Sequence, residues 1–366
     1  MSQQNLALPL AEKTNIRNWE FEDLVLQEDV PRTRLDISDY VPEGAKNVVV
    51  LCDGGIIEER LEECVSASLE GLSDIPANNR LLVLNTQACN SSLTITIAKN
   101  AKLSEPLYIT YISRERSLVH QTHIVIEQGA QADIVENFLS DSKLNSNVVC
   151  RVSLGANAKL NSSVINSLNG ENVVYYHRYT QVERDASLEA FNFIINDSNV
   201  VFEDVTMLAG KGSEACVTTV ALVTKKQQQN VTVRVENGAP QSIGSIVNYG
   251  VLKDEAHLAV NGVGKVQHGM RGSDNQQESR LLNLSKVAEA VANPFLLIDE
   301  GDITAGHAAS IGQLNEEQVY YLMSRGLKRE AAERTIAMGF LTPFANTIKN
   351  DVLKEQLLAT IREKLG

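Results

Sequence analysis

A single histidine, His307, lies in a run of small residues near the C-terminal end of this 366-residue chain. The run reads Ala-Gly-His-Ala-Ala-Ser over residues 305–310, and no bulky side chain within it shields the imidazole. A second protein surface could therefore approach the ring closely. Imidazole is a frequent metal ligand and can replace a thiolate on iron. We therefore treat His307 as a candidate metal ligand at an interface, although a lone histidine more often only hydrogen-bonds a backbone carbonyl in a turn.

A short helix is predicted directly after this run, over residues 315–325. Asn315 is a suitable N-cap, and Gln318 follows at the spacing that completes a capping box. Gly326 stands where a C-terminal cap is expected. The apolar stripe of this helix consists of Val319, Leu322 and Met323.

Three further side chains, Tyr320, Tyr321 and Arg325, lie off or beside this stripe. Their residue types are enriched at protein interfaces. At the least, the helix packs on its own domain through the stripe. The remaining side chains make it a candidate docking element for a partner.

Residues 305–326 together resemble the signature of the SufB/SufD family of iron–sulfur cluster assembly proteins. The pattern His-small-small-Ser-Ile-Gly-Gln at residues 307–313 resembles the SufD branch more closely than the SufB branch. Further family motifs lie upstream, at residues 281–285, 293–294, 299–302 and, more weakly, 18–21 and 84–88. The resemblance covers nearly the whole chain and is highly specific from Leu281 onward.

The resemblance implies a scaffold subunit of the SUF iron–sulfur cluster assembly machinery, and not an enzyme. The family's equivalent of His307 is expected at the seam with a SufB-like subunit, where it would face a cysteine and share a nascent iron–sulfur cluster. No cofactor is expected on the chain alone. The C-terminal helical part is expected to dock a SufC-like ATPase, whose ATP-driven movement would strain the seam. The expected docking residues are Asn315, Gln318, Tyr320, Tyr321, Arg325 and Gly326.

The cysteines restrict what this chain could contribute to such a cluster. They are Cys52, Cys64, Cys89, Cys150 and Cys216. All of them precede His307 by a long stretch of sequence, so thiolates beside the histidine would have to come mainly from another subunit. Many members of the SufD branch carry a cysteine two residues before the histidine, and Ala305 occupies that position here. The lack of any cysteine after Cys216 argues against the chain serving as SufB.

Other candidate ligands carry weaker signals. An odd offset places His120 and His123 on opposite faces of a strand, so we predict turn or surface histidines and no metal site. The β-rich surroundings of Cys150 and Cys216 predict small core residues. No ligand-like neighbours surround His177, His257 or His268.

The formal net charge of −13 argues against binding to nucleic acid or to an anionic membrane. The N-terminal residues show no basic region followed by an apolar core, and no run of about 18 apolar residues occurs. We therefore expect a cytoplasmic protein with reduced cysteines. The sequence also lacks the phosphate-binding motif of P-loop ATPases.

The elements that must position these residues indicate a mainly β fold: a parallel β-helix core with a small α/β N-terminal part and a helical C-terminal part. The expected boundaries are residues 1–105, 106–300 and 301–366. In the first part we expect a strand over 46–57, a helix over 58–72 and strands over 80–84 and 92–98. In the last part we expect helices over 315–325 and 328–338, and a third from Thr342-Pro343 to Leu365.

A loose repeat favours the β-helix. Similar small-residue motifs occur at residues 129–134 and 155–160, with weaker echoes at 183–188 and 253–258. The spacing of roughly 27 residues between the first three is typical of a solenoid. The longer last gap leaves room for turns near Gly210 and Gly238. An antiparallel sandwich is the competing architecture.

Two other functions stay open on the sequence. One is a β-helix enzyme acting on polysaccharide, which would need clustered acidic or basic groups on one sheet face, whereas Asp and Glu are scattered here. The other is a homodimeric scaffold similar to SufB. A homodimer of the isolated chain is also compatible with the sequence.

Overall fold

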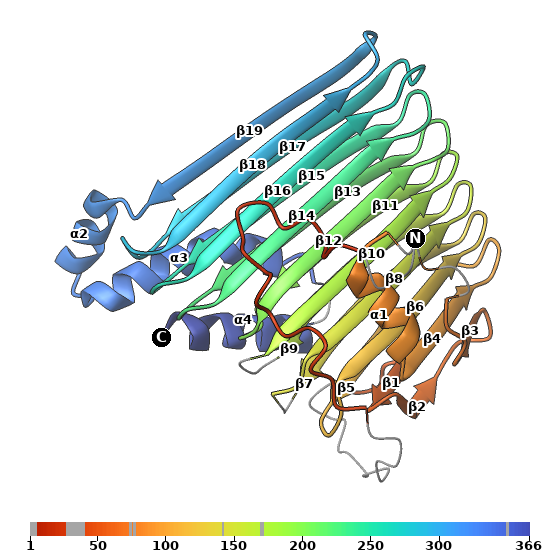
Figure 1. Cartoon of the computed structure of the whole chain (residues 1–366), viewed down its shortest axis with the longest axis horizontal. Coiled ribbons are helices and arrows are strands. Elements are labelled where there is room, and N and C mark those ends of the chain that lie inside the picture. The colour runs from red at the N-terminus through yellow and green to blue at the C-terminus, as the bar shows by residue number, and fades with distance from the viewer. Residues whose placement is uncertain are drawn as a thin grey trace.

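The computed structural model describes residues 6–26, 41–72, 75, 78–140, 143–168, 172–348 and 351–366. The chain alternates between two sheets that lie face to face and so forms a parallel β-helix, with helices on the outside (Figure 1). The predicted fold class is therefore confirmed. The competing antiparallel sandwich is wrong, because almost every strand pair is parallel.

Sheet A is 10-stranded and sheet B is 9-stranded. The spatial order of sheet A is β19 (Ile303–Gln313), β17 (Ser273–Asn283), β15 (Ile243–Leu252), β13 (Glu214–Val223), β11 (Ser187–Ile194), β9 (Lys159–Leu168), β7 (Gln131–Ser140), β5 (Leu107–Ser113), β1 (Asn47–Cys52) and β2 (Gly55–Arg60). The spatial order of sheet B is β18 (Glu289–Ile298), β16 (His257–Val266), β14 (Gln228–Asn237), β12 (Asn199–Leu208), β10 (Val173–Val182), β8 (Ser146–Leu154), β6 (Leu118–Ile126), β4 (Ser91–Ile97) and β3 (Val65–Ser68). Antiparallel pairing joins β1 to β2 and β3 to β4 at the N-terminal end.

Each rung of the β-helix contributes one strand to each sheet, and the turns between rungs stack in columns. One column contains the turns near Gly129, Gly155, Glu183, Gly210 and Gly238. Its backbone bonds include Gly155 N–H to the Ile126 carbonyl at 2.8 Å and Gly238 N–H to the Leu208 carbonyl at 3.0 Å. The turns predicted near Gly210 and Gly238 are thus present. The echo at 253–258 lies at the opposite edge, between β15 and β16, and belongs to the other column.

The interior of the β-helix, which we call the bore, is filled by every second side chain of each strand. Most of these side chains are Val, Ile, Leu and Ala, and they form one continuous buried cluster. Burying one such aliphatic side chain contributes about 1.5–3 kcal/mol. Because a rung alone cannot bury its inner face, stability depends on stacking one rung on the next.

The outer face of each sheet has its own cover. The helices α3 (Arg329–Ala345) and α4 (Asp351–Leu365) pack on apolar residues of sheet A, while α2 (Glu316–Ser324) projects near the C-terminal end of the stack (Figure 1). Sheet B is covered by α1 (Arg80–Ala88) and by the N-terminal segment 6–26. No helix among the described residues has the length and apolar composition needed to cross a bilayer.

Two predictions for the N-terminal part are wrong. The segment 58–72 is not a helix, since it contains the end of β2 and all of β3, and β3 pairs with β4. The segment 80–84 is not a strand but the start of α1, because the Asn79 side chain accepts hydrogen bonds from the N–H groups of Leu81 and Leu82 at 3.0 Å. The strands expected near 46–57 and 92–98 are present as β1 and β4.

The prediction that a helix begins at Thr342-Pro343 is also wrong. Both residues lie inside α3, which continues to Ala345 because its end packs on sheet A, with the rings of Phe344 and Tyr249 4.4 Å apart. The next helix, α4, starts at Asp351. Both sheets extend past the limits drawn at residues 106 and 300, since β1 and β4 precede the first and β19 follows the second.

Candidate interface at the open end

His307 lies in the middle of β19, the outermost strand of sheet A, and not in a turn. It is exposed, and its register partner on β17 is Gln277. Among the described residues, no strand pairs with the other edge of β19. The last rung, formed by β18 and β19, therefore leaves this end of the stack open, and we call it the open end.

The register places His307 on the inner face of its sheet. Its column along the stack consists of Leu107, Ile134, Ser162, Ala190, Val217, Ile246 and Gln277, all of them buried. Residues paired in register on parallel strands share one face of the sheet. His307 is thus an inward-facing residue that is exposed because no further rung covers it.

The backbone of His307 points away from the neighbouring strand. The N–H group of Asp274 donates at 3.0 Å to the carbonyl of Ser242, just before β15, and that of Leu284 donates at 2.8 Å to Leu252, the last residue of β15. The even-numbered residues of β17 therefore bond to β15 and the odd-numbered ones to β19. With Ser273 opposite Ile303, the even-numbered residues of β19 then bond to β17. The outward edge of β19 is formed by the N–H and carbonyl groups of Ile303, Ala305, His307, Ala309, Ile311 and Gln313.

The corresponding edge of β18 is interrupted. The N–H group of Glu289 donates at 2.9 Å to the carbonyl of Ala256, just before β16, and that of Asp299 donates at 3.0 Å to Val266, the last residue of β16. The backbone N–H and carbonyl groups of the even-numbered residues of β18 therefore face outward. One of these is Pro294, which has no N–H to donate. Of the two outermost strands, only β19 offers an edge without proline.

Exposed apolar side chains gather at the open end. Those on or near the last rung are Val287, Phe295, Leu297, Ile298 and Ile311, and those on or after α2 are Tyr320, Tyr321, Met323 and Leu327. Scattered exposed apolar residues are ordinary, but a group at an unpaired sheet edge is typical of an interaction surface.

The caps predicted for α2 at Asn315 and Gly326 are present. The Asn315 side chain accepts hydrogen bonds from the N–H groups of Glu317 and Gln318 at 2.9 and 3.3 Å. Gly326 has a φ of 96°, which favours glycine, and its N–H donates to the Met323 carbonyl at 2.9 Å. The apolar stripe is only partly buried: Val319 is buried, whereas Met323 is exposed.

The docking candidates and His307 form two separate surfaces. The guanidinium of Arg325 lies 5.3 Å from the ring centre of Tyr321, and Tyr320 is 74% exposed. From His307 to the end of β19 at Gln313 the strand rises about 20 Å. The histidine thus belongs to the last rung, and the tyrosines belong to the helix beyond it.

Comparison with known proteins identifies the family of this chain. The family described as SUF system FeS cluster assembly, SufBD core domain, matches residues 109–340. The chain belongs to the SufB/SufD family. The iron–sulfur cluster assembly protein SufD of Bacillus subtilis is 31% identical over 99% of this chain and 91% of its own length. SufD of Escherichia coli is 23% identical over 83% of this chain and 74% of its own length. A SufBD family protein of Staphylococcus saprophyticus is 26% identical over 74% of this chain and 60% of its own length. The predicted resemblance to the SufD branch is confirmed.

Potential metal ligands do not gather at the open end among the residues that the structure describes. No group of three or more His, Cys, Asp and Glu within the described part of the chain could hold a metal ion. Cys150 is buried in the bore, as predicted, whereas Cys216 is only half-buried. Only His307 therefore offers a metal-binding side chain on the inner face of β19.

The prediction that both HxxH histidines lie in turns or at the surface is wrong for His120. It is fully buried in β6, within 2.7 Å of the Ser91 hydroxyl and 2.6 Å of the Thr122 hydroxyl, and burial lowers its pKa to about 3. His123 is half-buried, with its ring 3.2 Å from the Ser153 hydroxyl. Neither ring belongs to a group of three or more potential metal ligands among the described residues.

The bore also contains a charged cluster that carries no sequence signal. Arg178 donates to the Ser162 hydroxyl at 2.9 Å and lies 3.8 Å from Glu136, while Asp204 accepts from Asn192 at 2.9 Å. Burial raises the pKa of both carboxyl groups, and Arg178 opposes this shift. These residues lie in the middle of the stack, several rungs from His307.

Proposed function

We propose that this chain is a non-enzymatic, SufD-like scaffold subunit of a cytoplasmic iron–sulfur cluster assembly complex. It pairs with a SufB-like subunit through its last rung and docks a SufC-like ATPase with its C-terminal helices. The observation that carries the proposal is the open end, where an uninterrupted strand edge, exposed apolar residues and His307 coincide. A polysaccharide-acting enzyme is disfavoured by the family.

At the seam, the outward N–H and carbonyl groups of β19 bind a strand of the partner by main-chain hydrogen bonds. The exposed side chains around the strand, among them Phe295 and Ile311, lose water on contact and add to affinity. His307 then faces the joined bores of the two subunits. Because this chain brings no thiolate there, the partner supplies the cysteines, and the nascent cluster is cargo shared between the subunits.

The docking element is α2, with Asn315, Gln318, Tyr320, Tyr321, Arg325 and Gly326. Its two caps fix the ends of a short helix that would be marginal alone. The exposed tyrosine rings provide contact area at low conformational cost. When the SufB-like subunit is missing, the edge of β19 can pair antiparallel with a second copy of itself, which gives a homodimer.

The decisive experiment is co-expression with the cognate SufB-like and SufC-like proteins. We expect His307→Ala to retain the complex but to slow cluster formation at least about tenfold, because an iron ligand is lost. His268→Ala is the matched control, since His268 is an exposed histidine in the turn between β16 and β17. Failure of the wild type to form a complex would contradict the scaffold role. Undiminished cluster formation by His307→Ala would remove His307 from the chemistry.

The docking proposal has its own test. Replacing Tyr320 by alanine should weaken binding of the SufC-like protein about tenfold, as expected for loss of an interface tyrosine. The control is Leu10→Ala, since Leu10 is 75% exposed but lies in the N-terminal segment on sheet B. Calorimetric titration of the SufC-like protein measures both. Equal affinities of the two variants would place the docking surface elsewhere.

A further inference from the structure

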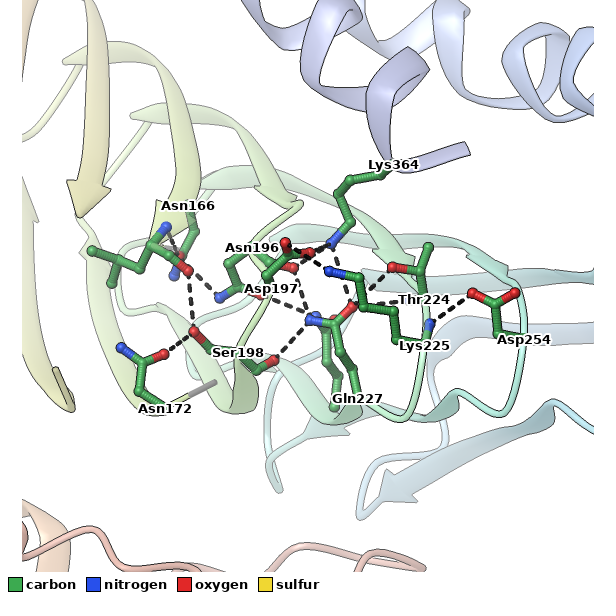
Figure 2. Close-up of polar contacts among 12 residues, drawn as sticks. Asn166, Asn172, Asn196, Asp197, Ser198, Thr224, Lys225, Gln227, Asp254 and Lys364 are labelled. Atoms are coloured by element: carbon green, nitrogen blue, oxygen red, sulfur yellow. Dashed lines mark hydrogen bonds and ion pairs between the residues drawn. The ribbon is translucent and has the colours of Figure 1, made fainter. Parts of the chain in front are cut away.

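The last turn of α4 is attached to the β-helix through an ion pair between a buried lysine and a half-buried aspartate (Figure 2). The side chain of Lys364 is only 7% exposed, and its ammonium donates to Asp197 at 2.9 Å. It also donates to the carbonyl of Asn196 and, at 3.4 Å, to the side chain of Gln227. These acceptors belong to two stacked turns, one after β11 and one after β13. The end of one helix is thus held by two rungs.

The acceptors are themselves fixed to one another. Gln227 donates to the carbonyls of Asn196 at 2.9 Å and Ser198 at 3.2 Å, and its own oxygen accepts from the N–H of Thr224 at 2.9 Å. Asn196 in turn donates to Asn166, the residue near the end of β9, at 3.2 Å. Three successive rungs are therefore cross-linked beneath Lys364 (Figure 2).

The charges favour an ionised pair. Burial lowers the pKa of Lys364, against the attraction of Asp197. Burial also disfavours the charge of Asp197, but Lys364 and Lys225 outweigh it, so that the pKa of Asp197 is lowered. Lys225, at 3.4 Å from Asp197, is 71% exposed and contributes a screened interaction. Removing Asp197 leaves the buried ammonium of Lys364 without its carboxylate, which is strongly unfavourable, whereas Asp197, 34% exposed, still has Lys225 when Lys364 is removed.

A second lysine holds the same helix end. The ammonium of Lys253, in the turn between β15 and β16, donates to the Leu365 carbonyl at 2.7 Å. A positive charge at this position complements the helix dipole. In addition, Arg334 of α3 donates to the carbonyl of Gly366, which ties the two helices together. The end of α4 is thus attached to the turns of consecutive rungs on one side and to α3 on the other.

Directional contacts of this kind matter for force transmission. Apolar packing of α3 and α4 on sheet A is non-directional and permits packed helices to slide over a surface. An ion pair with fixed acceptors resists sliding. The exposed α2 makes its contacts mainly with α3, so movement applied to α2 reaches the β-helix through α3 and α4 as well as through the short link to β19.

We propose that Lys364, Asp197, Gln227 and Lys253, which we call the clamp, form the rigid joint that carries movement of the docked ATPase into the β-helix and its seam. Lys364 is a positioning residue, since it is only 7% exposed and its acceptors all belong to turns of its own β-helix. The inference rests on the proposed function. Its first part, the rigid attachment of α4, concerns this chain alone and can be tested separately.

The attachment is tested on the isolated chain by hydrogen exchange of the α4 amides. Lys364→Met should lower their protection about tenfold while protection of the inner strands stays unchanged. Lys354→Met is the matched control, since Lys354 lies on the same helix and pairs with Asp351 at its solvent-facing start. If Lys364→Met misfolds, Lys253→Met provides the milder test. Unchanged α4 protection in a folded clamp variant would overturn the joint.

The transmission is tested in the complex with the SufB-like and SufC-like proteins. Lys364→Met should leave assembly of the complex and ATP hydrolysis intact but lower the number of clusters formed per ATP about fivefold. Lys354→Met should leave assembly of the complex, ATP hydrolysis and the number of clusters per ATP unchanged. A loosened α4 with unchanged clusters per ATP would overturn transmission and leave the proposed function standing. Absence of any complex with the wild-type chain would instead overturn the proposed function, and transmission with it.

Discussion

The two ends of the β-helix differ in the length, direction and charge of their outermost strands (Figure 1). At the N-terminal end the outermost strands are β2, of 6 residues, and β3, of 4 residues. Both turn antiparallel to their neighbours, and β2 ends in Glu58-Glu59-Arg60. At the open end the outermost strands are β18, of 10 residues, and β19, of 11 residues, and both continue the parallel stack.

The difference shows what each end is built to do. Short, antiparallel edge strands, of which β2 is also charged, prevent a further strand from pairing, as terminal caps of repeat proteins commonly do. A long edge of small residues such as β19 has no such protection. In a monomer it would be an aggregation hazard, so its presence favours a partner that covers it.

The same contrast exists between positions on one face of sheet A. Ile246 and His307 share one inward column, yet Ile246 is 1% exposed and His307 lies at the surface. Position within the stack, and not the direction of the side chain, decides burial. Substitutions in the interior should therefore change the free energy of unfolding, whereas substitutions at the open end should change association with a partner.

The largest effect is expected in the middle of the bore, where Arg178 balances two carboxyl groups. Arg178→Met leaves Glu136 and Asp204 buried without a cation and should lower the free energy of unfolding by about 3–5 kcal/mol. Both carboxyl pKa values, already raised by burial, would rise further. A carboxyl group whose pKa is higher in the folded than in the unfolded chain stabilises the fold less as pH rises. The loss of unfolding free energy in Arg178→Met should therefore be larger at pH 8 than at pH 5.

Urea unfolding at the two pH values measures this effect. Asp204→Asn is the control, because it removes one carboxylate and leaves Arg178 paired with Glu136, and it should cost about 1 kcal/mol or less. A loss below about 1 kcal/mol for Arg178→Met, or the opposite pH trend, would show that the cluster is hydrated and not dry.

The second prediction compares two inward-facing isoleucines on sheet A, one in the stack and one in the last rung. Ile246→Ala should destabilise the chain by about 2–4 kcal/mol, because it leaves a cavity. Ile311→Ala should cost about 1 kcal/mol or less in the free chain, since Ile311 is already 49% exposed. Thermal unfolding measures both. Equal losses would mean that the open end is covered in the free chain, for instance by a second copy.

The sequence predicted the β-helix and α2 because both depend on local signals. The motifs at Gly129 and Gly155 repeat with the rung, and Asn315 and Gly326 cap α2 as expected. Prediction from the sequence failed where pairing with a distant segment determines the local structure. The segment 58–72 pairs as strands to close the N-terminal end, although its apolar spacing also fits a helix.

The candidate site was predictable only in part. His307 could be singled out by its small neighbours, but its inward direction follows from the register of the whole stack. The clamp and the bore cluster join residues from different rungs, as Lys364 and Asp197 illustrate, so no short motif marks them. In the sequence Pro294 is only part of a family motif. That it removes an N–H from the outward edge of β18 follows from the pairing of β18 with β16.

The third prediction compares the edges of β18 and β19 directly. Ala309→Pro removes an N–H that points away from β17, so the ladder within the chain stays intact while the outward edge loses a donor. We expect association with the SufB-like subunit to weaken about 100-fold, or about 2.7 kcal/mol. Ala292→Pro makes the same change on β18, where Pro294 already interrupts the outward edge, and should weaken association less than about tenfold. Analytical ultracentrifugation of the mixed proteins, with the melting temperature of each free variant, separates association from folding. Equal weakening by the two variants would mean that the seam uses both edges alike, and no weakening by Ala309→Pro would mean that the partner does not pair with β19.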